Sequence, residues 1–262
     1  MKLILCADDF GQSEAIDQAI TQLIEMDRLS ATSCMTLSPR WAQAAKKLTP
    51  NIRKKAAIGL HLDFTHFGDA TSHPKLVLMC LARQLSTSKI KLSINQQLDA
   101  FETAIGSMPD YVDGHQHVHQ LPQIREALLE ILLTRYGDNL PWLRIAKPPL
   151  ADGFKGLIIR GLGSRALEKK AKAQGFMCSG DLLGAYGFNG SSDDYLDRFQ
   201  GWLKEIRSDT ATPVLMCHPA VDMPFNTDDG IYPARVIEFG VLASDAIAKE
   251  LNRFNLAKSP SG

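Results

Sequence analysis

The first twenty residues of the chain, MKLILCADDFGQSEAIDQAI (residues 1–20), show the unit from which the fold is built. A short apolar run at residues 3–7 is followed by two adjacent aspartates, Asp8 and Asp9, and then by apolar side chains with helical spacing. Neighbouring carboxylates at the end of a buried strand repel each other and cost free energy to desolvate. They therefore either cap the next helix or share a positively charged group.

The alternation of apolar runs with helical patterns continues along nearly the whole chain. It implies parallel strands joined by crossover helices, and about seven such units without a linker-like break favour one domain over residues 1–262. We expect an α/β, TIM-barrel-like (β/α) barrel of about seven parallel strands, with a doubly wound open sheet as the alternative. The predicted strands are residues 3–7, 31–37, 56–65, 111–118, 140–146, 176–178 and 213–217. The predicted helices follow Ser13 and cover residues 41–48, 94–105, 124–135, 157–173, 194–207 and 236–254.

Three segments interrupt this regularity. Residues 66–92 are interpreted as an elaborated loop with a short helix, and residues 219–233, rich in Pro, Asp and Gly, as a second long loop. Residues 258–262 are predicted to form a flexible tail.

The composition restricts the classes of partner. The chain carries 29 basic and 29 acidic residues, so its zero net charge gives no attraction to nucleic acid or to an anionic membrane surface. A small, neutral or weakly charged partner is expected, and a homodimer only because it is the commonest assembly. No apolar run approaches the ~20 residues that span a bilayer, and the N-terminus lacks a signal-peptide pattern. Five scattered cysteines without a CxxC pair are typical of a reducing compartment, so we expect a cytoplasmic location.

The strongest chemical signal is DGHQHVH at residues 113–119. Its three histidines recur with a period of two, so we expect them on one face of an extended strand or its continuation. Titratable residues also end other predicted strands: Asp8 and Asp9 the first, His61 the third and His218 the last. The carboxyl ends of parallel strands form the rim that carries the active site in such folds. Imidazole nitrogen and aspartate oxygen are common ligands of divalent metal ions, so a metal site is predicted there.

These residues also have structural interpretations. A helix cap explains Asp8 and Asp9 equally well, and a lone His61 is more often a core histidine with satisfied hydrogen bonds. Three imidazoles on one strand face are poorly explained by packing, so the HxHxH pattern favours metal binding. His66 and His73, in the irregular segment, are predicted to be surface residues.

The ordered motifs resemble those of a known family. ADDFGQS at residues 7–13, GLHLDFT at 59–65, DGHQHVHQLP at 113–122 and CHP at 217–219 are similar to motifs of the YdjC-like carbohydrate deacetylases. That family includes chitooligosaccharide deacetylases and a hopanoid-biosynthesis deacetylase. The resemblance implies a TIM-barrel-like fold and removal of acetyl groups from N-acetylated sugars or oligosaccharides.

The resemblance also implies a metal site and catalytic roles. In the family one divalent metal ion, for which we expect Mg²⁺ or Zn²⁺, is bound by one aspartate of the pair and two histidines. Matched residue by residue, these ligands fall on Asp9, His61 and His115. Asp8 resembles the general base of metal-dependent polysaccharide deacetylases, and His218 stands where a histidine would act as the acid.

Four further residues are assigned to the surroundings of this site. His117 and His119 are predicted to contact the substrate or to orient the ligands. Asp113 is expected either to hold an imidazole in the required tautomer or to make a structural hydrogen bond. Arg144 is expected to meet a polar group of the substrate or to pair with Asp8.

Three departures from the family pattern concern the substrate. Asp17 stands where an asparagine is expected, Ala220 stands where a glycine is usual, and the loop after His61 is compact. Because that loop shapes substrate entry, the identity of the substrate is the property that these differences leave open.

Two other functions also remain open. Another metal-dependent hydrolase, such as a phosphoesterase or an amidohydrolase, would use the same ligands. A phosphate-directed site would bring more basic side chains to the strand ends, where the sequence offers Arg144 and Lys147. A non-catalytic carbohydrate-binding protein with a structural metal would have no use for a base at Asp8.

Overall fold

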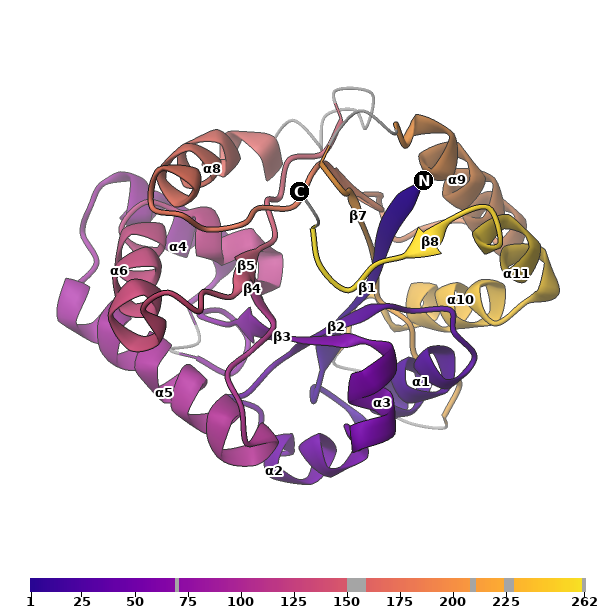
Figure 1. Ribbon diagram of the computed structural model, residues 1–262, viewed down its shortest axis with the longest axis horizontal. Helices are drawn as coiled ribbons and strands as arrows, with labels where there is room; N and C mark the ends of the chain where they lie inside the picture. Colours follow the sequence, from indigo (N-terminus) through magenta and orange to yellow (C-terminus); the bar gives the residue numbers. More distant parts are fainter. Residues whose placement is uncertain (69–70, 150–158, 208–210, 224–228, 261–262) are drawn as a thin grey trace.

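The computed structural model describes residues 1–68, 71–149, 159–207, 211–223 and 229–260. Seven parallel strands form one curved sheet in the order β5–β4–β3–β2–β1–β7–β6, and the helices surround it (Figure 1). The predicted α/β, barrel-like fold with about seven parallel strands is therefore confirmed. The strands are β1 (Lys2–Phe10), β2 (Ala31–Cys34), β3 (Ala57–Leu62), β4 (Tyr111–Gly114), β5 (Trp142–Leu143), β6 (Leu182–Leu183) and β7 (Val214–Cys217), and β8 (Asn255–Leu256) pairs with the start of β1.

The two edges of the sheet meet through one short contact. Leu143 in β5 forms a parallel bridge with Cys178, four residues before β6 begins. The N–H of Leu143 donates to the carbonyl of Met177, and the N–H of Ser179 donates to the carbonyl of Leu143, both at 2.9 Å. The predicted strand at residues 176–178 is thus only this bridge, while β6 itself was not predicted because two residues are too short to show a period.

The helices follow the predicted alternation. Ser13 caps α1 as predicted, because its hydroxyl accepts a hydrogen bond from the N–H of Ile16 at 3.3 Å. The helices are α1 (Glu14–Glu25), α2 (Trp41–Ala44), α3 (Pro50–Lys55), α4 (His73–Leu81), α5 (Thr87–Ile105), α6 (Ile124–Tyr136), α8 (Ser164–Ala173), α9 (Ser192–Glu205), α10 (Tyr232–Leu242) and α11 (Asp245–Leu251), with 3₁₀ turns at Ala45–Lys47 and His115–Gln120. Among the described helices, none is long and apolar enough to cross a membrane.

Several boundaries differ from the prediction. The segment predicted as one helix over 236–254 is divided between α10 and α11, because Ser244 caps the second helix by accepting from the N–H of Ile247. The irregular segment 66–92 contains α4 and the start of α5. Of the helix predicted over 157–173, residues 157–158 lie outside the described residues. The same holds for 261–262 of the predicted tail, in which Lys258 Nζ donates to the carbonyl of Lys54 at 3.0 Å.

The core has two parts, separated by the sheet. Alternate strand residues such as Leu3, Leu5 and Ala7 pack outward against the helices in the larger cluster. The residues between them, Ile4 and Cys6 in β1, point into the barrel and form the smaller cluster with their counterparts on the other strands. This alternation decides which side chains reach the interior at the carboxyl ends of the strands.

Candidate active site

The inward face of the strands carries the candidate site residues. Because side chains alternate, Asp8 continues the inward series of Ile4 and Cys6, and His61 continues that of Ala57. The same parity places the remaining predicted residues of the rim on the inside: Asp113, Arg144 and His218. The sequence thus predicted which strand ends would meet, and the structure brings them together.

Asp9 does not follow this alternation. In a regular strand its side chain would point outward beside Ala7, away from Asp8. The backbone of Asp9 instead has a φ of 72°, and the pairing of β1 with β2 shifts register between Ala7 and Phe10. This irregularity turns the second carboxylate back into the barrel. The bend lies at Asp9 itself.

Asp9, His61 and His115 form the first cluster. Asp9 Oδ1 lies 3.0 Å from His115 Nδ1 and 3.4 Å from His61 Nε2, and one ligand atom of each residue lies within 4.8 Å of the others. His61 Nδ1 is 2.6 Å from Asp113 Oδ1, as expected where a carboxylate orients a metal-binding histidine. One carboxylate and two imidazoles are a donor set that suits a divalent ion, so these residues fit the metal that the sequence predicted.

The charges around His61 favour a positive charge at this point. Burial alone would lower the pKa of His61, but the carboxylates of Asp113 and Asp8 outweigh it and raise that pKa to about 10. Burial alone would likewise raise the pKa of Asp9, yet the Arg235 guanidinium and His115 hold it well below its usual range.

Asp8 belongs to a second, separate cluster built around Arg144. The two guanidinium nitrogens Nη1 and Nη2 of Arg144 lie 2.6 and 2.8 Å from the two oxygens of Asp8, and Nη1 also lies 3.0 Å from Asp113 Oδ2. Cys6 completes this group, its Sγ 3.6 Å from the same Nη1. Arg144 is fully buried, and its charge overrides the effect of burial so that the pKa of Asp8 falls below its usual range. The guanidinium already fills the space among these anions, so this group has no room for a metal ion.

The histidine motif has a different shape from the one predicted. The predicted strand over 111–118 ends at Gly114, because Gln116 and His117 have φ angles of 51° and 62° and turn the chain into a 3₁₀ segment. The turn folds back so closely that a Cβ on Gly114 would lie 3.0 Å from the backbone nitrogen of His119. The three histidines therefore do not share one strand face.

The turn sends the three imidazoles to different places. His115 lies against Asp9, and His117 lines the cavity, where its Nδ1 has no hydrogen-bond partner among the described residues. His119 is fully buried, and its Nε2 donates to the carbonyl of Arg144 at 2.8 Å. His119 was predicted either to contact the substrate or to orient the ligands. Because its side chain does not reach the cavity, only a role in positioning neighbouring groups is compatible with the structure.

His218 lies on the other side of Asp8. Its Nε2 is 3.9 Å from Asp8 Oδ2, and burial lowers the pKa of His218 to about 4. Its backbone N–H donates to the carboxylate of Glu238 at 2.5 Å, and Glu238 also accepts from the Tyr186 hydroxyl at 2.7 Å. The ring of Phe188 stands edge-on to the imidazole, with centroids 5.1 Å apart.

Two residues of α10 that hold the site, Arg235 and Glu238, carry no recognisable sequence signal. Arg235 Nη2 lies 2.7 Å from Asp9 Oδ2, and Arg235 Nε lies 2.6 Å from Asp229 Oδ2. Glu238, one turn later, holds the backbone of His218. Arg235 precedes the helix predicted over 236–254 and Glu238 lies within it, and only the packing of α10 against the rim brings both to the strand ends.

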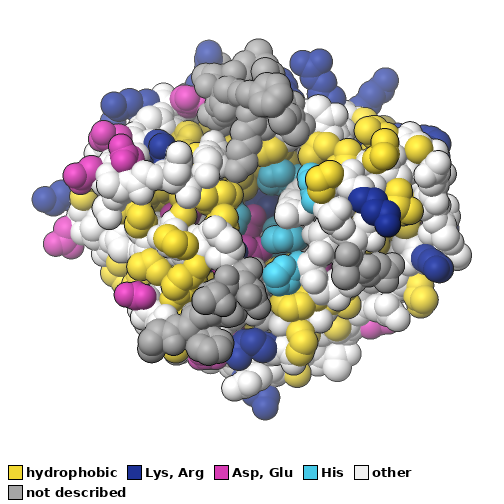
Figure 2. All heavy atoms as spheres, turned by 180° about the vertical axis from the view of Figure 1, so that it is seen from behind, with side chains coloured by type: hydrophobic (Ala, Val, Ile, Leu, Met, Phe, Trp, Pro, Cys, Tyr) yellow, Lys and Arg dark blue, Asp and Glu magenta, His cyan; other side chains and the backbone are white. Residues whose placement is uncertain are grey.

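A cavity of about 470 Å³ opens onto these groups. Figure 2 shows histidine side chains around a hollow on this face, with acidic side chains at its floor. His66 is exposed, as predicted, whereas His73 is half-buried, and both line the cavity. Its remaining lining is mostly apolar and includes Ile159, Leu162 and Ile231, so a ligand with both polar and apolar surfaces fits it.

Comparison with known proteins agrees with the family resemblance of the sequence motifs. The family model of the YdjC-like proteins matches residues 2–253 of the chain. The chain belongs to the YdjC-like family. The resemblance carried by the four sequence motifs is thereby confirmed.

Two relatives and one solved structure are similar to the chain. A chitooligosaccharide deacetylase of Yersinia enterocolitica serotype O:8 / biotype 1B is 25% identical, over 96% of this chain and 94% of that protein. A carbohydrate deacetylase of Danio rerio is 28% identical over 50% of this chain, which spans about half (46%) of that protein. A protein of Enterococcus faecalis V583, with a suggested role in cellobiose-phosphate cleavage, superposes with a TM-score of 0.73 at 19% identity. It covers 98% of this chain and 96% of its own, and this likeness shows the shared fold.

Proposed function

We propose that this protein is a metal-dependent carbohydrate deacetylase, which hydrolyses the acetamide of N-acetylated sugars such as chitooligosaccharides. The observation that carries the proposal is the pairing of a metal-ligand cluster, Asp9, His61 and His115, with Asp8 and His218 on one cavity. The names of the YdjC-like relatives support the substrate class.

The ligand cluster would hold one divalent ion, Mg²⁺ or Zn²⁺. When bound, such an ion supplies a more acidic water and polarises the acyl oxygen. Asp113 keeps the Nε2 of His61 directed toward Asp9, and Arg235 occupies the second oxygen of Asp9. The chain itself therefore fixes which atoms of the ligands face the ion.

In this proposal Asp8 accepts a proton and His218 donates one. Arg144 keeps Asp8 ionised, so its carboxylate can accept the proton of the attacking water. The hydroxyl adds to the acyl carbon, the C–N bond breaks, and the amine nitrogen needs one proton. Asp8 Oδ2 and His218 Nε2 are 3.9 Å apart, which is longer than a hydrogen bond, so the proton gained at Asp8 would pass to His218 through one water molecule, and His218 would deliver it to the amine.

The charges at the cavity favour an amide over a phosphate ester. Arg235 lines the cavity, but Asp9 and Asp229 already pair with it. Arg144 is buried against Asp8, and Lys147 pairs with Glu168 at 3.1 Å. The described lining therefore offers no arginine or lysine without a carboxylate partner for a phosphoryl group.

The test is release of acetate from N-acetylated chitooligosaccharides by the purified protein. The reaction is run after chelation and again after addition of Mg²⁺, Zn²⁺ or Co²⁺, with phosphate release from sugar phosphates measured in parallel. We expect acetate release that is lost on chelation and restored by a metal. Acetate release that ignores the chelator would refute the metal dependence, and phosphate release alone would favour the phosphoesterase.

A further inference from the structure

The loop between β6 and α9 presents one aromatic ring to the cavity. Phe188 lines the cavity, is half-buried, and lies edge-on to His218 with an interplanar angle of 87°. No strand or helix periodicity marks this residue, and the chemistry proposed above does not use it. Its ring is nevertheless the aromatic surface beside the group that would protonate the leaving amine.

The backbone of Phe188 is strained. Its φ is 57°, a left-handed conformation that is uncommon for a bulky residue and that glycine adopts freely. Such strain persists only where the surroundings fix it, and it is frequent in ligand-binding loops.

The loop is anchored on both sides of the ring. The Tyr186 hydroxyl donates to Glu238, and the carbonyl of Asn189 accepts from Arg198 Nη1 at 2.6 Å. At Gly184 the chain passes so near β7 that a Cβ would lie 2.2 Å from the carbonyl oxygen of Met216. These contacts fix the position of the ring before any ligand arrives, which lowers the entropic cost of binding.

We propose that Phe188 is the platform on which the sugar ring of the substrate stacks, which makes it a specificity-determining residue. This inference rests on the proposed deacetylase function and narrows it. A pyranose with equatorial substituents presents a flat face of C–H groups, which packs well on an aromatic ring. Because His218 contacts the Phe188 ring directly, with centroids 5.1 Å apart, a substituent of a sugar stacked on Phe188 would lie at the imidazole.

The proposal selects one substrate class. The preferred acetamide is carried by a closed pyranose, and an open-chain sugar with the same groups binds more weakly. The apolar residues Ile159 and Leu162 of the same cavity complete the enclosure of such a ring.

The test compares binding of N-acetylglucosamine with that of N-acetylglucosaminitol, its open-chain reduced form, by calorimetry. Wild type is measured with Phe188→Gly, Phe188→Trp and a control, Phe254→Ala, which removes a half-buried ring outside the cavity. We expect wild type to prefer the closed ring by about tenfold, which corresponds to the size of an aromatic contact. Phe188→Gly should abolish this preference, while Phe188→Trp and Phe254→Ala keep it.

Glycine at position 188 separates folding from binding. It adopts the left-handed backbone without strain, so the melting temperature of Phe188→Gly should stay close to that of wild type. A preference for the closed ring that survives in Phe188→Gly would overturn the platform while leaving the deacetylase proposal intact. If neither sugar binds wild type and no acetate is released, the proposed function fails, and the platform with it.

Discussion

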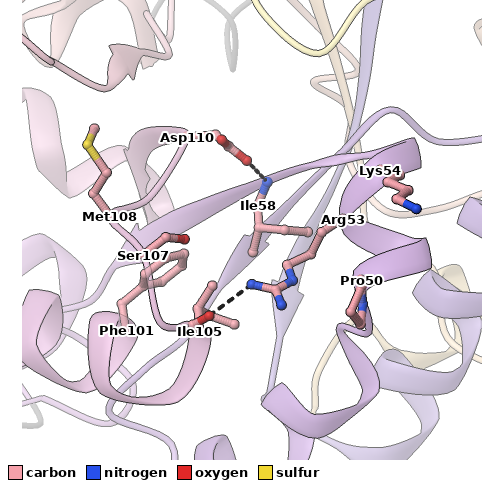
Figure 3. Close-up of a pocket in the computed structure, with 9 residues that line it drawn as sticks. All are labelled: Pro50, Arg53, Lys54, Ile58, Phe101, Ile105, Ser107, Met108 and Asp110. Atoms are coloured by element: carbon pink, nitrogen blue, oxygen red, sulfur yellow. Dashed lines mark hydrogen bonds between the residues drawn. The ribbon is translucent and has the colours of Figure 1, made fainter.

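Both ends of the sheet hold a cavity with charged side chains, but the two ends use their charges differently. At the amino ends of β3 and β4, the charged side chains that line a cavity of about 320 Å³ make hydrogen bonds within the fold (Figure 3). Arg53 Nη1 donates to the carbonyl of Ile105 at the end of α5, at 2.8 Å. Asp110 accepts from the N–H of Ile58 at 2.7 Å. These charges complete backbone hydrogen bonds and hold connections in place.

At the carboxyl ends the charges face one another around a larger cavity. Buried nitrogen atoms of His73, His117, His218 and Arg235 there have no hydrogen-bond partner among the described residues. No atom lining the cavity at the amino ends belongs to that group. Buried polar atoms are seldom left unpartnered, so their concentration identifies the end where a ligand is expected. The presence of charge alone does not.

The largest expected difference concerns catalysis. Asp8→Asn removes the proposed base, so acetate release should fall about 10²–10⁴-fold, the usual contribution of general acid–base catalysis. Asp110→Asn, the same change at the amino end, should leave the turnover rate unchanged, because its amide oxygen can still accept from Ile58. Both rates are measured at saturating metal. Equal rates for the two variants would show that Asp8 is not the base.

The next difference concerns stability. Arg144→Leu removes the guanidinium that pairs with both oxygens of buried Asp8 and leaves Asp113 with His61 as its cationic partner, which should lower the free energy of unfolding by about 3–5 kcal/mol. Arg53→Leu removes one hydrogen bond at the end of a helix and should cost about 1 kcal/mol. Urea unfolding in the presence of chelator measures both values. An equal loss of unfolding free energy in Arg53→Leu and Arg144→Leu would contradict the proposed difference between the two ends.

A smaller effect concerns pH. Burial lowers the pKa of His119 from 6.5 to about 4. Between these two pH values, His119 is therefore protonated in the unfolded chain but neutral in the folded protein. Stability from this group is complete above pH 6.5 and is lost as the pH falls toward 4. In His119→Gln the free energy of unfolding should decrease less steeply as the pH falls, by up to about 1.4 kcal/mol per pH unit.

Unfolding followed in metal-free buffer between pH 4 and 7 measures this slope. The described lining of the amino-end cavity contains no histidine, so the effect belongs to the carboxyl end. Parallel pH curves for wild type and His119→Gln would contradict it.

The alternation of strand side chains made much of the site predictable. Parity alone places Asp8, His61 and His218 on the inner face of the barrel, and strand ends of a parallel sheet share one rim. No long-range information is needed for this step.

The remaining features depend on contacts that no local pattern contains. The left-handed backbone at Asp9 and His117 interrupts the alternation of side chains. As a result, Asp9 points into the barrel although alternation would direct it away from Asp8, and the three histidines diverge although alternation would align them. Arg235 and Glu238 reach the rim only because α10 packs there. The short strands β5 and β6 offer too few residues for any period to be seen.

The central claim is that Asp9, His61 and His115 hold one divalent ion beside Asp8. An anomalous diffraction map from crystals of the full chain grown with Co²⁺ or Zn²⁺ tests it most directly. We expect one strong peak within ~2.0–2.3 Å of Asp9 Oδ1, His61 Nε2 and His115 Nδ1. A map with no peak at these atoms, or with a peak among Cys6, Asp8 and Asp113 in place of Arg144, would contradict it.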